Sequence, residues 1–324
     1  MYRVGIIGCG LIGTKRASNL GSFSLAGCAD IDPKKAEEFS KQFKTKIFDS
    51  PEKLIESNEI EVVFICTLHD SLFELTKIAM AENKHILVEK PGAKNLEEVL
   101  ELLSLKEKST SKIRVGFNHR YHRAFRKLDE LIEEDHLGDL MFLRSRYGHG
   151  GRLGYEKEWR ADLDKSGGGE LIDQGPHLID LSRKILGEFE EVHGTVHTYF
   201  WDMEVDDNAF LTLTTSEEKV AFLHVSCTEW KNTFSMEVYG KKGKAHISGL
   251  GGSYGVEKLI FYKMSDQMGP PETQVWEYPM EDDSWQFEIQ EFFNDIKLDR
   301  EPEAGLIEAK RVHQVIKKVY DSSN

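Results

Sequence analysis

Apolar and polar positions follow different patterns in the two halves of this 324-residue chain. In the first 120 residues, short apolar runs alternate with segments whose apolar residues have helical spacing. Continuous apolar runs predict strands buried on both faces, which is typical of a parallel sheet covered by helices. The alternation therefore predicts an α/β domain with a doubly wound parallel sheet over residues 1–120. Its predicted strands are residues 3–7, 25–30, 46–48, 60–66, 85–88 and 113–117.

Helices are predicted between these strands. They cover residues 33–43, a segment ending at Ala81 that Asp70 or Ser71 can cap, and a segment up to Lys108 that Asn95 can cap.

Beyond residue 120, one or two helices are followed by a series of short strands separated by turn residues. The sequence Gly-Lys-Lys-Gly at 240–243 predicts a hairpin turn, so these strands form an antiparallel sheet. We predict a second, α+β domain over residues 121–324 with an open, largely antiparallel sheet. The predicted strands are 195–200, 208–214, 220–226, 234–239, 244–247 and 259–262. Helices at 283–298 and 304–320 close the chain, and the second can pack back on the first domain.

Three glycines directly follow the first strand, with Leu11 and Ile12 between the last two. Gly8 permits a tight turn, Gly10 lets the backbone approach a pyrophosphate, and Gly13 lets the next helix pack against the strand. The amides at the N-terminus of that helix can then bind phosphate. Because the chain contains 27 glycines, this spacing alone is weak, and its position between a strand and a helix is what predicts a dinucleotide site.

Asp30 closes the second predicted strand, twenty residues after Gly10. A carboxylate there receives the adenosine ribose hydroxyls and repels a 2′-phosphate, which predicts NAD rather than NADP. Lys34 and Lys35 nearby keep NADP open as the alternative. Asp30 or Asp32 can instead cap the helix that begins at Pro33, and Asp32 is the better placed of the two.

Two further segments carry candidate chemistry. Lys90 follows the strand 85–88 after one residue, Glu89, and ligands of open parallel sheets bind at the carboxyl ends of strands. Alternatively, Lys90 is an ordinary surface lysine. In the second half, a glycine triplet precedes Asp173, His177 and Asp180, which share one face of a predicted apolar helix. Buried titratable groups need partners or a chemical role. In the alternative, purely structural interpretation, Asp173 caps the helix and His177 forms a hydrogen bond with Asp180.

Composition narrows the ligand and the location. A net charge of −14 at pH 7 opposes binding to nucleic acid or to an anionic membrane, so a small molecule is expected. No apolar stretch approaches membrane-spanning length, and the first strand begins at residue 3, which leaves no room for a targeting peptide. We therefore expect a cytoplasmic protein. The cysteines are too scattered for a disulfide framework or a zinc site, so no metal is expected; they are Cys9, Cys28, Cys66 and Cys227.

Taken together, these motifs give the chain a resemblance to the Gfo/Idh/MocA oxidoreductase family. The features that carry it are the glycine turn, Glu89-Lys90-Pro91, and Gly168-Gly169 followed by Asp173, Gly175, His177 and Asp180. The resemblance implies hydride exchange between a nicotinamide and a carbon of a sugar or cyclitol. It also implies an open second-domain sheet with one face toward the active site and the other toward a neighbouring subunit, in a dimer or tetramer.

The resemblance also implies roles for individual residues. Lys90 resembles the family lysine that contacts the reacting hydroxyl or carbonyl, His177 its general acid or base, and Asp173 the carboxylate that orients the substrate. Glu89 and Lys90 also border the cofactor. Many relatives have Thr-Pro-Asn, and a His three residues later, on the nicotinamide side. This chain has Thr67-Leu68-His69 with Leu72 in the last position, so Thr67 and His69 are the expected cofactor contacts.

The substrate prediction rests on cations and aromatic rings. Asn118, Arg120 and His122 lie where the family places substrate contacts, and an arginine-rich segment covers residues 144–160. Guanidinium groups bind phosphates and carboxylates, and rings stack on sugars or bases, which favours an anionic or nucleotide-linked sugar of surface polysaccharide biosynthesis. The residues of this segment are Arg144, Arg146, Tyr147, His149, Arg152, Tyr155, Trp159 and Arg160.

Other interpretations stay open. The arginines can equally form exposed ion pairs with Glu156, Glu158 and Asp162. An inositol or free-sugar dehydrogenase is the alternative enzyme, and a lyase or glycosidase that uses NAD as a transient hydride store is a third. A non-catalytic NAD-sensing regulator is the alternative of another class.

Overall fold

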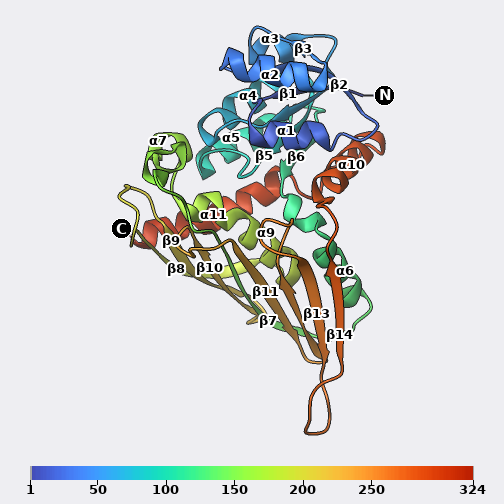
Figure 1. Cartoon of the computed structure of the whole chain (residues 1–324), viewed down its shortest axis with the longest axis vertical. Coiled ribbons are helices and arrows are strands. Elements are labelled where there is room, and N and C mark those ends of the chain that lie inside the picture. Colours follow the sequence, from blue (N-terminus) through green and yellow to red (C-terminus); the bar gives the residue numbers. More distant parts are fainter. Residues whose placement is uncertain (1, 324) are drawn as a thin grey trace. The chain divides into compact units, whose positions relative to one another are not determined.

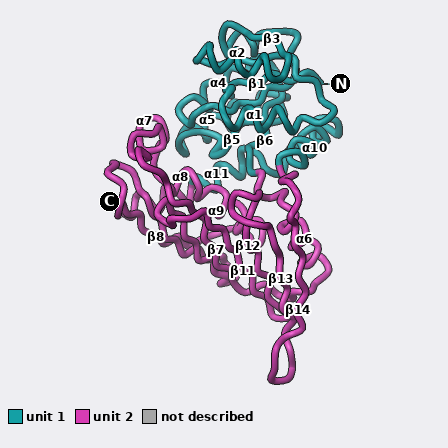
Figure 2. The backbone as a smooth tube through the Cα atoms, viewed as in Figure 1, with its two compact units in different colours: residues 1–117, 285–313 teal, residues 118–284, 314–324 magenta. Residues whose placement is uncertain are grey.

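The computed structural model describes residues 2–323, and its chain divides into two compact units (Figures 1 and 2). Unit 1 contains the residues up to Phe117 together with Trp285–His313. Unit 2 contains Asn118–Ser284 and the end of the chain from Gln314. The division at residue 120 that the sequence predicts lies near the first limit. It allows the last helix, 304–320, to pack back on the first domain but does not assign the preceding helix to that domain. Each unit is described below by itself.

Unit 1 is built on a six-stranded parallel sheet in the order β3-β2-β1-β4-β5-β6. This arrangement confirms the predicted doubly wound fold, because the chain turns back at β1 and adds β4, β5 and β6 on the other side. The strands are β1 (Arg3–Ile7), β2 (Ser24–Ala29), β3 (Lys46–Ile47), β4 (Val62–Ile65), β5 (His85–Glu89) and β6 (Ile113–Gly116). The intervening helices are α1 (Leu11–Ser18), α2 (Pro33–Phe43), α3 (Pro51–Glu56), α4 (His69–Ala81) and α5 (Leu96–Lys106).

Local sequence explains most of these boundaries. The β4 residues are all fully buried, as the continuous apolar run predicts. Asp32 caps α2 by accepting from the Lys34 amide, and Asn95 caps α5 through the Glu98 amide, so both predicted caps are confirmed. Helix α4 differs from the prediction, because it begins at His69 and has no side-chain cap from Asp70 or Ser71.

The core of unit 1 includes a helix from the far end of the chain. Helix α10 (Ser284–Lys297) inserts Phe292 and Phe293 against β1 and β4, and the Phe293 ring stacks on Phe23 with centroids 3.5 Å apart. Helix α11 (Leu306–Ser323) begins in unit 1 and ends in unit 2. The sequence pattern shows that α10 is amphipathic but cannot show which core its apolar face joins, and this explains the difference from the division at residue 120.

Unit 2 contains an eight-stranded sheet in the order β14-β13-β12-β11-β7-β10-β9-β8. Its neighbouring strands are antiparallel except for the parallel pair β7 and β10, which confirms the largely antiparallel prediction. The predicted hairpin at 240–243 joins two of its strands, β11 and β12. The strands are β7 (Leu140–Gly148), β8 (Phe189–His197), β9 (Asn208–Thr215), β10 (Val220–Ser226), β11 (Thr233–Gly240), β12 (Gly243–Ser248), β13 (Glu257–Lys263) and β14 (Thr273–Tyr278).

The sequence prediction missed β7 and β14. Strand β7 carries two arginines, and its sequence predicts a loop, whereas β14 is mostly exposed and lacks a regular apolar alternation. One face of the sheet packs against α6 (Arg123–Glu133) and α9 (Gly175–Leu186). Short helical segments connect these elements; they are η1 (Asn118–Tyr121), η2 (Tyr155–Lys157), η3 (Trp159–Ala161), α7 (Leu163–Ser166) and α8 (Glu170–Asp173). None of the helices in residues 2–323 has the length and apolar character to cross a bilayer.

A buried histidine in unit 1 generates a prediction about stability. The Nε2 atom of His313 lies 3.1 Å from the Pro91 carbonyl oxygen, and the residue is only 2% exposed. Burial lowers the pKa of His313 from 6.5 to about 4, although the Pro91 and Ala93 carbonyls and Glu97 act in the opposite direction. The imidazole therefore stays neutral in the folded chain at pH values where the unfolded chain binds a proton.

We expect the free energy of unfolding to fall as the pH drops from about 6.5 to about 4, by on the order of 3 kcal/mol from this residue. In His313→Gln, an amide N–H can still reach Pro91 but nothing titrates, so this part of the pH dependence should disappear. Urea unfolding of both proteins at pH 7 and pH 4 measures the difference. Identical pH dependence in the two proteins would contradict the prediction.

Candidate functional site

The glycine turn of unit 1 is shaped for close approach of a ligand. Gly8 has a φ of 92°, and a Cβ atom on it would lie 2.4 Å from the Cys66 carbonyl oxygen. A Cβ on Gly13 would lie 1.9 Å from the Gly8 carbonyl oxygen, so both positions require glycine. A Cβ on Gly10 would meet nothing within 4 Å, which leaves open space beside the backbone. Helix α1 starts immediately afterwards, at the exposed Leu11, with Ile12 in its first turn.

Asp30 is fixed beside this turn. Its Oδ2 accepts from the Cys9 amide at 2.7 Å and its Oδ1 accepts from the Asp32 amide at 2.8 Å. Asp32 is the residue that caps α2, so Asp30 is not needed as the cap. A partly exposed carboxylate held at the end of β2 fits the predicted ribose contact.

The nicotinamide-side candidates follow β4. Thr67 is partly buried, and His69 is the first residue of α4 and only 3% exposed. The segment borders the glycine turn, because the Cys66 amide donates to the Ile7 carbonyl at 2.8 Å. The residues that would hold NAD in unit 1 are therefore Gly8, Gly10, Leu11, Ile12, Gly13, Asp30, Thr67 and His69, and these contacts remain predictions.

Glu89 and Lys90 lie at the carboxyl end of β5. The Glu89 carboxylate accepts from the Arg16 guanidinium at 2.7 Å, and Glu89 is 8% exposed. This internal ion pair was not predicted, and it turns the carboxylate toward α1. Lys90 is partly buried and precedes a cis peptide bond to Pro91.

In unit 2, the sequence predicts one helix that contains Asp173, His177 and Asp180, but the structure has two helices there. Helix α8 ends at Asp173 and α9 starts at Gly175, so Asp173 and His177 lie on different helices. A Cβ on Gly169 would lie 1.9 Å from the Asp206 carbonyl oxygen, which makes this glycine obligatory. The Asp206 carboxylate accepts from the Gly169 and Leu171 amides at 3.0 and 2.8 Å and from the Tyr320 hydroxyl at 2.7 Å. These bonds fix the start of α8.

Asp173 and His177 each have a close neighbour. The His177 ring stacks on the His119 ring with centroids 3.7 Å apart and an interplanar angle of 15°. The Asp173 Oδ2 accepts from Arg160 Nε at 2.8 Å. Arg160 also lies over the Trp159 ring, at 4.5 Å from its centroid. Arg160 thus lies between Asp173 and the Trp159 ring, and the role of these residues in substrate binding stays a prediction.

Several predicted substrate contacts are used inside the fold. Arg120 forms a buried two-pronged ion pair with Asp180, at 2.7 and 2.6 Å. His122 Nδ1 lies 3.1 Å from Glu257 Oε2, and Asn118 donates to the Ser284 hydroxyl at 3.1 Å. These three residues are between 3% and 6% exposed, and they connect η1 to the rest of unit 2.

The arginine-rich segment does not form one cluster, which corrects the sequence interpretation. Arg144 and Arg146 belong to β7, where alternation places them on the sheet face opposite the buried Tyr147. Arg152 is exposed and forms a 2.7 Å ion pair with Glu158, as the alternative interpretation expected. Of the four arginines, Arg160 is the one placed next to Asp173.

Sequence reasoning missed Glu170, a buried carboxylate close to this site. Tyr155, predicted as a substrate contact, is itself only 3% exposed, and its hydroxyl donates to Glu170 Oε1 at 2.8 Å. The same oxygen lies 3.5 Å from His149 Nε2, while His149 Nδ1 accepts from the Gly151 amide at 3.0 Å. Tyr155 and His149 therefore anchor the loop 149–155 to Glu170. The position of Glu170 directly after the glycine triplet was the available signal.

Comparison with known proteins identifies the family. Residues 2–117 match the profile described as an oxidoreductase family with an NAD-binding Rossmann fold, and residues 125–246 match that of the GFO/IDH/MocA C-terminal domain. The chain belongs to the Gfo/Idh/MocA oxidoreductase family. Its first unit is therefore an NAD-binding domain of the Rossmann type.

Relatives in this family act on different compounds. The chain is 33% identical over 186 residues to glucose-6-phosphate 3-dehydrogenase of Bacillus subtilis, covering 56% of this chain and 53% of that protein. It is 31% identical over 197 residues to myo-inositol 2-dehydrogenase of Thermotoga maritima, covering 59% and 57%. The chain thus matches little more than half the length of these two relatives.

Solved structures show the same fold. A levoglucosan dehydrogenase in complex with NADH and levoglucosan superposes with a TM-score of 0.90 at 21% identity, covering 99% of this chain and 97% of that chain. A UDP-N-acetylglucosamine 3-dehydrogenase from Acidithiobacillus ferrooxidans gives a TM-score of 0.81 at 21% identity, covering 99% and 97%.

The placement of Asp30 predicts cofactor preference. We expect Asp30→Ala to weaken NAD binding about tenfold or more while affecting NADP little, because hydrogen bonds to a charged group contribute roughly 1.5–3 kcal/mol. Titration of protein fluorescence with each cofactor measures both dissociation constants. Asp32→Ala is the matched control, since it removes the α2 cap and should leave the ratio of the two constants unchanged. Equal losses for NAD and NADP in Asp30→Ala would contradict ribose recognition.

Proposed function

We propose that this protein is an NAD-dependent dehydrogenase that transfers a hydride between nicotinamide and a secondary alcohol or ketone carbon of a sugar or cyclitol. The observation that carries the proposal is the glycine turn, with open space at Gly10 and a carboxylate fixed beside it at Asp30. Bound nicotinamide would supply the hydride acceptor or donor. The residues of this chain would bind the substrate and move its proton.

We assign catalytic roles to three side chains, one of which transfers the proton. When a carbinol is oxidised, its carbon loses a hydride and its hydroxyl loses a proton, and we assign the proton to His177. The ammonium group of Lys90 would stabilise the negative charge that develops on the substrate oxygen. Asp173, held by Arg160, would orient the substrate hydroxyl. Lys90 lies in unit 1 and the other two lie in unit 2, so their meeting at one carbon is part of the proposal.

The substrate class is proposed more broadly than the sequence suggested. The preference for an anionic or nucleotide-linked sugar depended on four arginines, and two of them lie on the other face of the sheet. What supports an anionic sugar is now Arg160, which lies beside Asp173, and the similarity to glucose-6-phosphate 3-dehydrogenase. A neutral cyclitol is the second candidate, supported by the similarity to myo-inositol 2-dehydrogenase.

A substrate panel tests the activity. We expect NADH formation, followed at its absorbance band, with at least one of myo-inositol, glucose, glucose 6-phosphate and UDP-linked sugars. Lys90→Ala and His177→Ala should lower kcat by about 100-fold or more, the usual contribution of acid, base or electrostatic groups, with little change in NAD affinity. Tight NAD binding without turnover of any compound would favour a cofactor-sensing regulator, and full activity of both variants would contradict the assigned roles.

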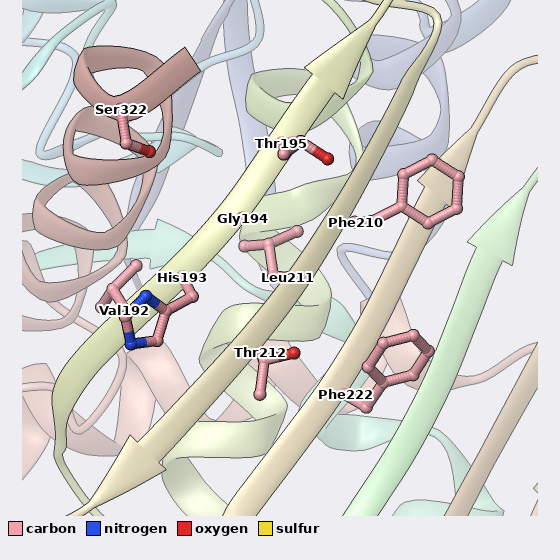
Figure 3. A pocket seen from close by; sticks show the side chains of 9 residues that line it. All are labelled: Val192, His193, Gly194, Thr195, Phe210, Leu211, Thr212, Phe222 and Ser322. Carbon is pink, nitrogen blue, oxygen red and sulfur yellow. The ribbon is translucent and has the colours of Figure 1, made fainter.

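We further propose that the second face of the unit 2 sheet binds another copy of this chain. The outward side chains Phe142 and Phe222 are 40% and 51% exposed, whereas an ordinary solvent-facing sheet surface is polar. Two hollows of about 340 and 410 Å³ lie on this face and share Phe222. Figure 3 shows the first, with the rings of Phe210 and Phe222 on neighbouring strands.

Charge supports a second copy as the occupant. Of the two arginines that line the larger hollow, Arg144 pairs with Glu237 of the same hollow. Arg146 is therefore the cation to which a carboxylate from another copy of this acidic chain, with its net charge of −14, can bind.

Disruption of this face should change the molecular mass in solution. Phe222→Glu would place a charge between the two hollows, so we expect wild-type dimers or tetramers to become monomers, as measured by size-exclusion chromatography with light scattering. Leu298→Glu, at an exposed apolar position of unit 1, is the control and should assemble normally. A monomeric wild-type protein, or a variant that assembles unchanged, would contradict this interface.

A further inference from the structure

The residue before Lys90 is held by a buried ion-pair chain within unit 1. Arg16, on α1, donates through Nε to Glu89 Oε1 at 2.7 Å and through another nitrogen to Glu288 Oε2. Glu288 lies on α10, 272 positions along the chain from Arg16. One guanidinium therefore connects the helix after the glycine turn, the end of β5 and a C-terminal helix.

This chain of contacts is closed to solvent. Arg16 and Glu288 are fully buried and Glu89 is 8% exposed. The Arg16 guanidinium also lies over the Trp285 ring, at 4.5 Å from its centroid. A Cβ atom on Gly116 would lie 2.8 Å from one Arg16 nitrogen and 2.9 Å from Glu89 Oε2, so β6 leaves space for the pair only because it has glycine there. Charges that are buried this completely cannot rearrange without a large desolvation cost.

The residues after Lys90 are held from another helix. The Pro91 carbonyl faces His313 Nε2 on α11 at 3.1 Å. Gly92 has a φ of 90°, and a Cβ on it would lie 3.2 Å from the Ala309 side chain on the same helix. The turn 89–92 is therefore fixed on both sides of Lys90 by residues that come from the C-terminal segment 285–313.

We propose that Arg16, Glu288 and His313 are positioning residues for Lys90: they act through Glu89 and Pro91 and fix where the ammonium group projects. The inference rests on the proposed function, in which Lys90 contacts the reacting oxygen. Electrostatic stabilisation depends on the position of the charge, and a displacement of about 1 Å can cost about 100-fold in rate.

The same helix provides a matched control. Asp295, also on α10, forms a buried ion pair with Arg114 on β6, and both residues are 1% exposed. This pair is buried as completely as the Arg16–Glu288 pair, and it also joins α10 to the rest of unit 1, through β6 instead of α1. Asp295 additionally pairs with Arg300, and neither of its two ion pairs involves Glu89. Asp295→Asn should therefore reproduce the loss of stability caused by Glu288→Gln without its effect on Lys90.

The test compares Glu288→Gln, His313→Leu and Asp295→Asn in the full-length protein, each also combined with Lys90→Ala. With the best substrate of the panel, we expect kcat to fall about tenfold in the first two variants, with an unchanged dissociation constant for NAD, and to stay near wild type in Asp295→Asn. In the Lys90→Ala background, the first two substitutions should cause no further loss, because their effect passes through Lys90.

Crystal structures of the same variants provide a readout that needs no substrate. We expect the backbone at 89–91 to be displaced in Glu288→Gln and His313→Leu but not in Asp295→Asn. An unmoved turn, a kcat as low in Asp295→Asn as in Glu288→Gln, or full additivity with Lys90→Ala would overturn the positioning role. Full activity of Lys90→Ala itself would instead overturn the proposed function and this inference together.

Discussion

A single buried cation, Arg16, connects the parts of unit 1 on which the candidate chemistry depends. It forms ion pairs with Glu89 and Glu288, and its planar guanidinium lies over the indole ring of Trp285. A lysine could not make these contacts together, because it lacks the planar fork of donors. Burial raises the pKa of Glu288, with the Glu89 charge adding to the effect and Arg16 opposing it. The dinucleotide turn, the end of β5 and α10 are therefore electrostatically interdependent.

Much of unit 1 could be predicted from sequence because its signals are local. Apolar runs, glycine spacing and the caps at Asp32 and Asn95 each depend on residues within a few positions of one another. The Arg16 network could not be predicted, because its members are 73 and 272 positions apart and each resembles an ordinary surface charge. Local sequence patterns therefore do not show which charged residues form buried ion pairs in the folded chain.

Unit 2 shows a second reason for incomplete prediction. Strand β7 has Arg144 and Arg146 on one face and the buried Leu143 and Tyr147 on the other, and its continuous apolar run covers only residues 140–143. Assigning its arginines to a loop produced an apparent cluster of cations around the substrate. Alternation along the strand separates them, and Arg160 is the one that lies beside Asp173. The proposed substrate class became broader because Arg144 and Arg146 lie in strand β7 and not in the loop that the sequence predicts.

The path of the chain also has a consequence for biosynthesis. The parallel sheet is complete by residue 116, yet the phenylalanines of α10 that fill its core are translated almost 180 residues later. The nascent N-terminal region must therefore leave the ribosome with part of its apolar surface uncovered, while the whole of the intervening sheet is synthesised. Aggregation during translation, rather than instability of the finished protein, is the hazard that this order of elements creates.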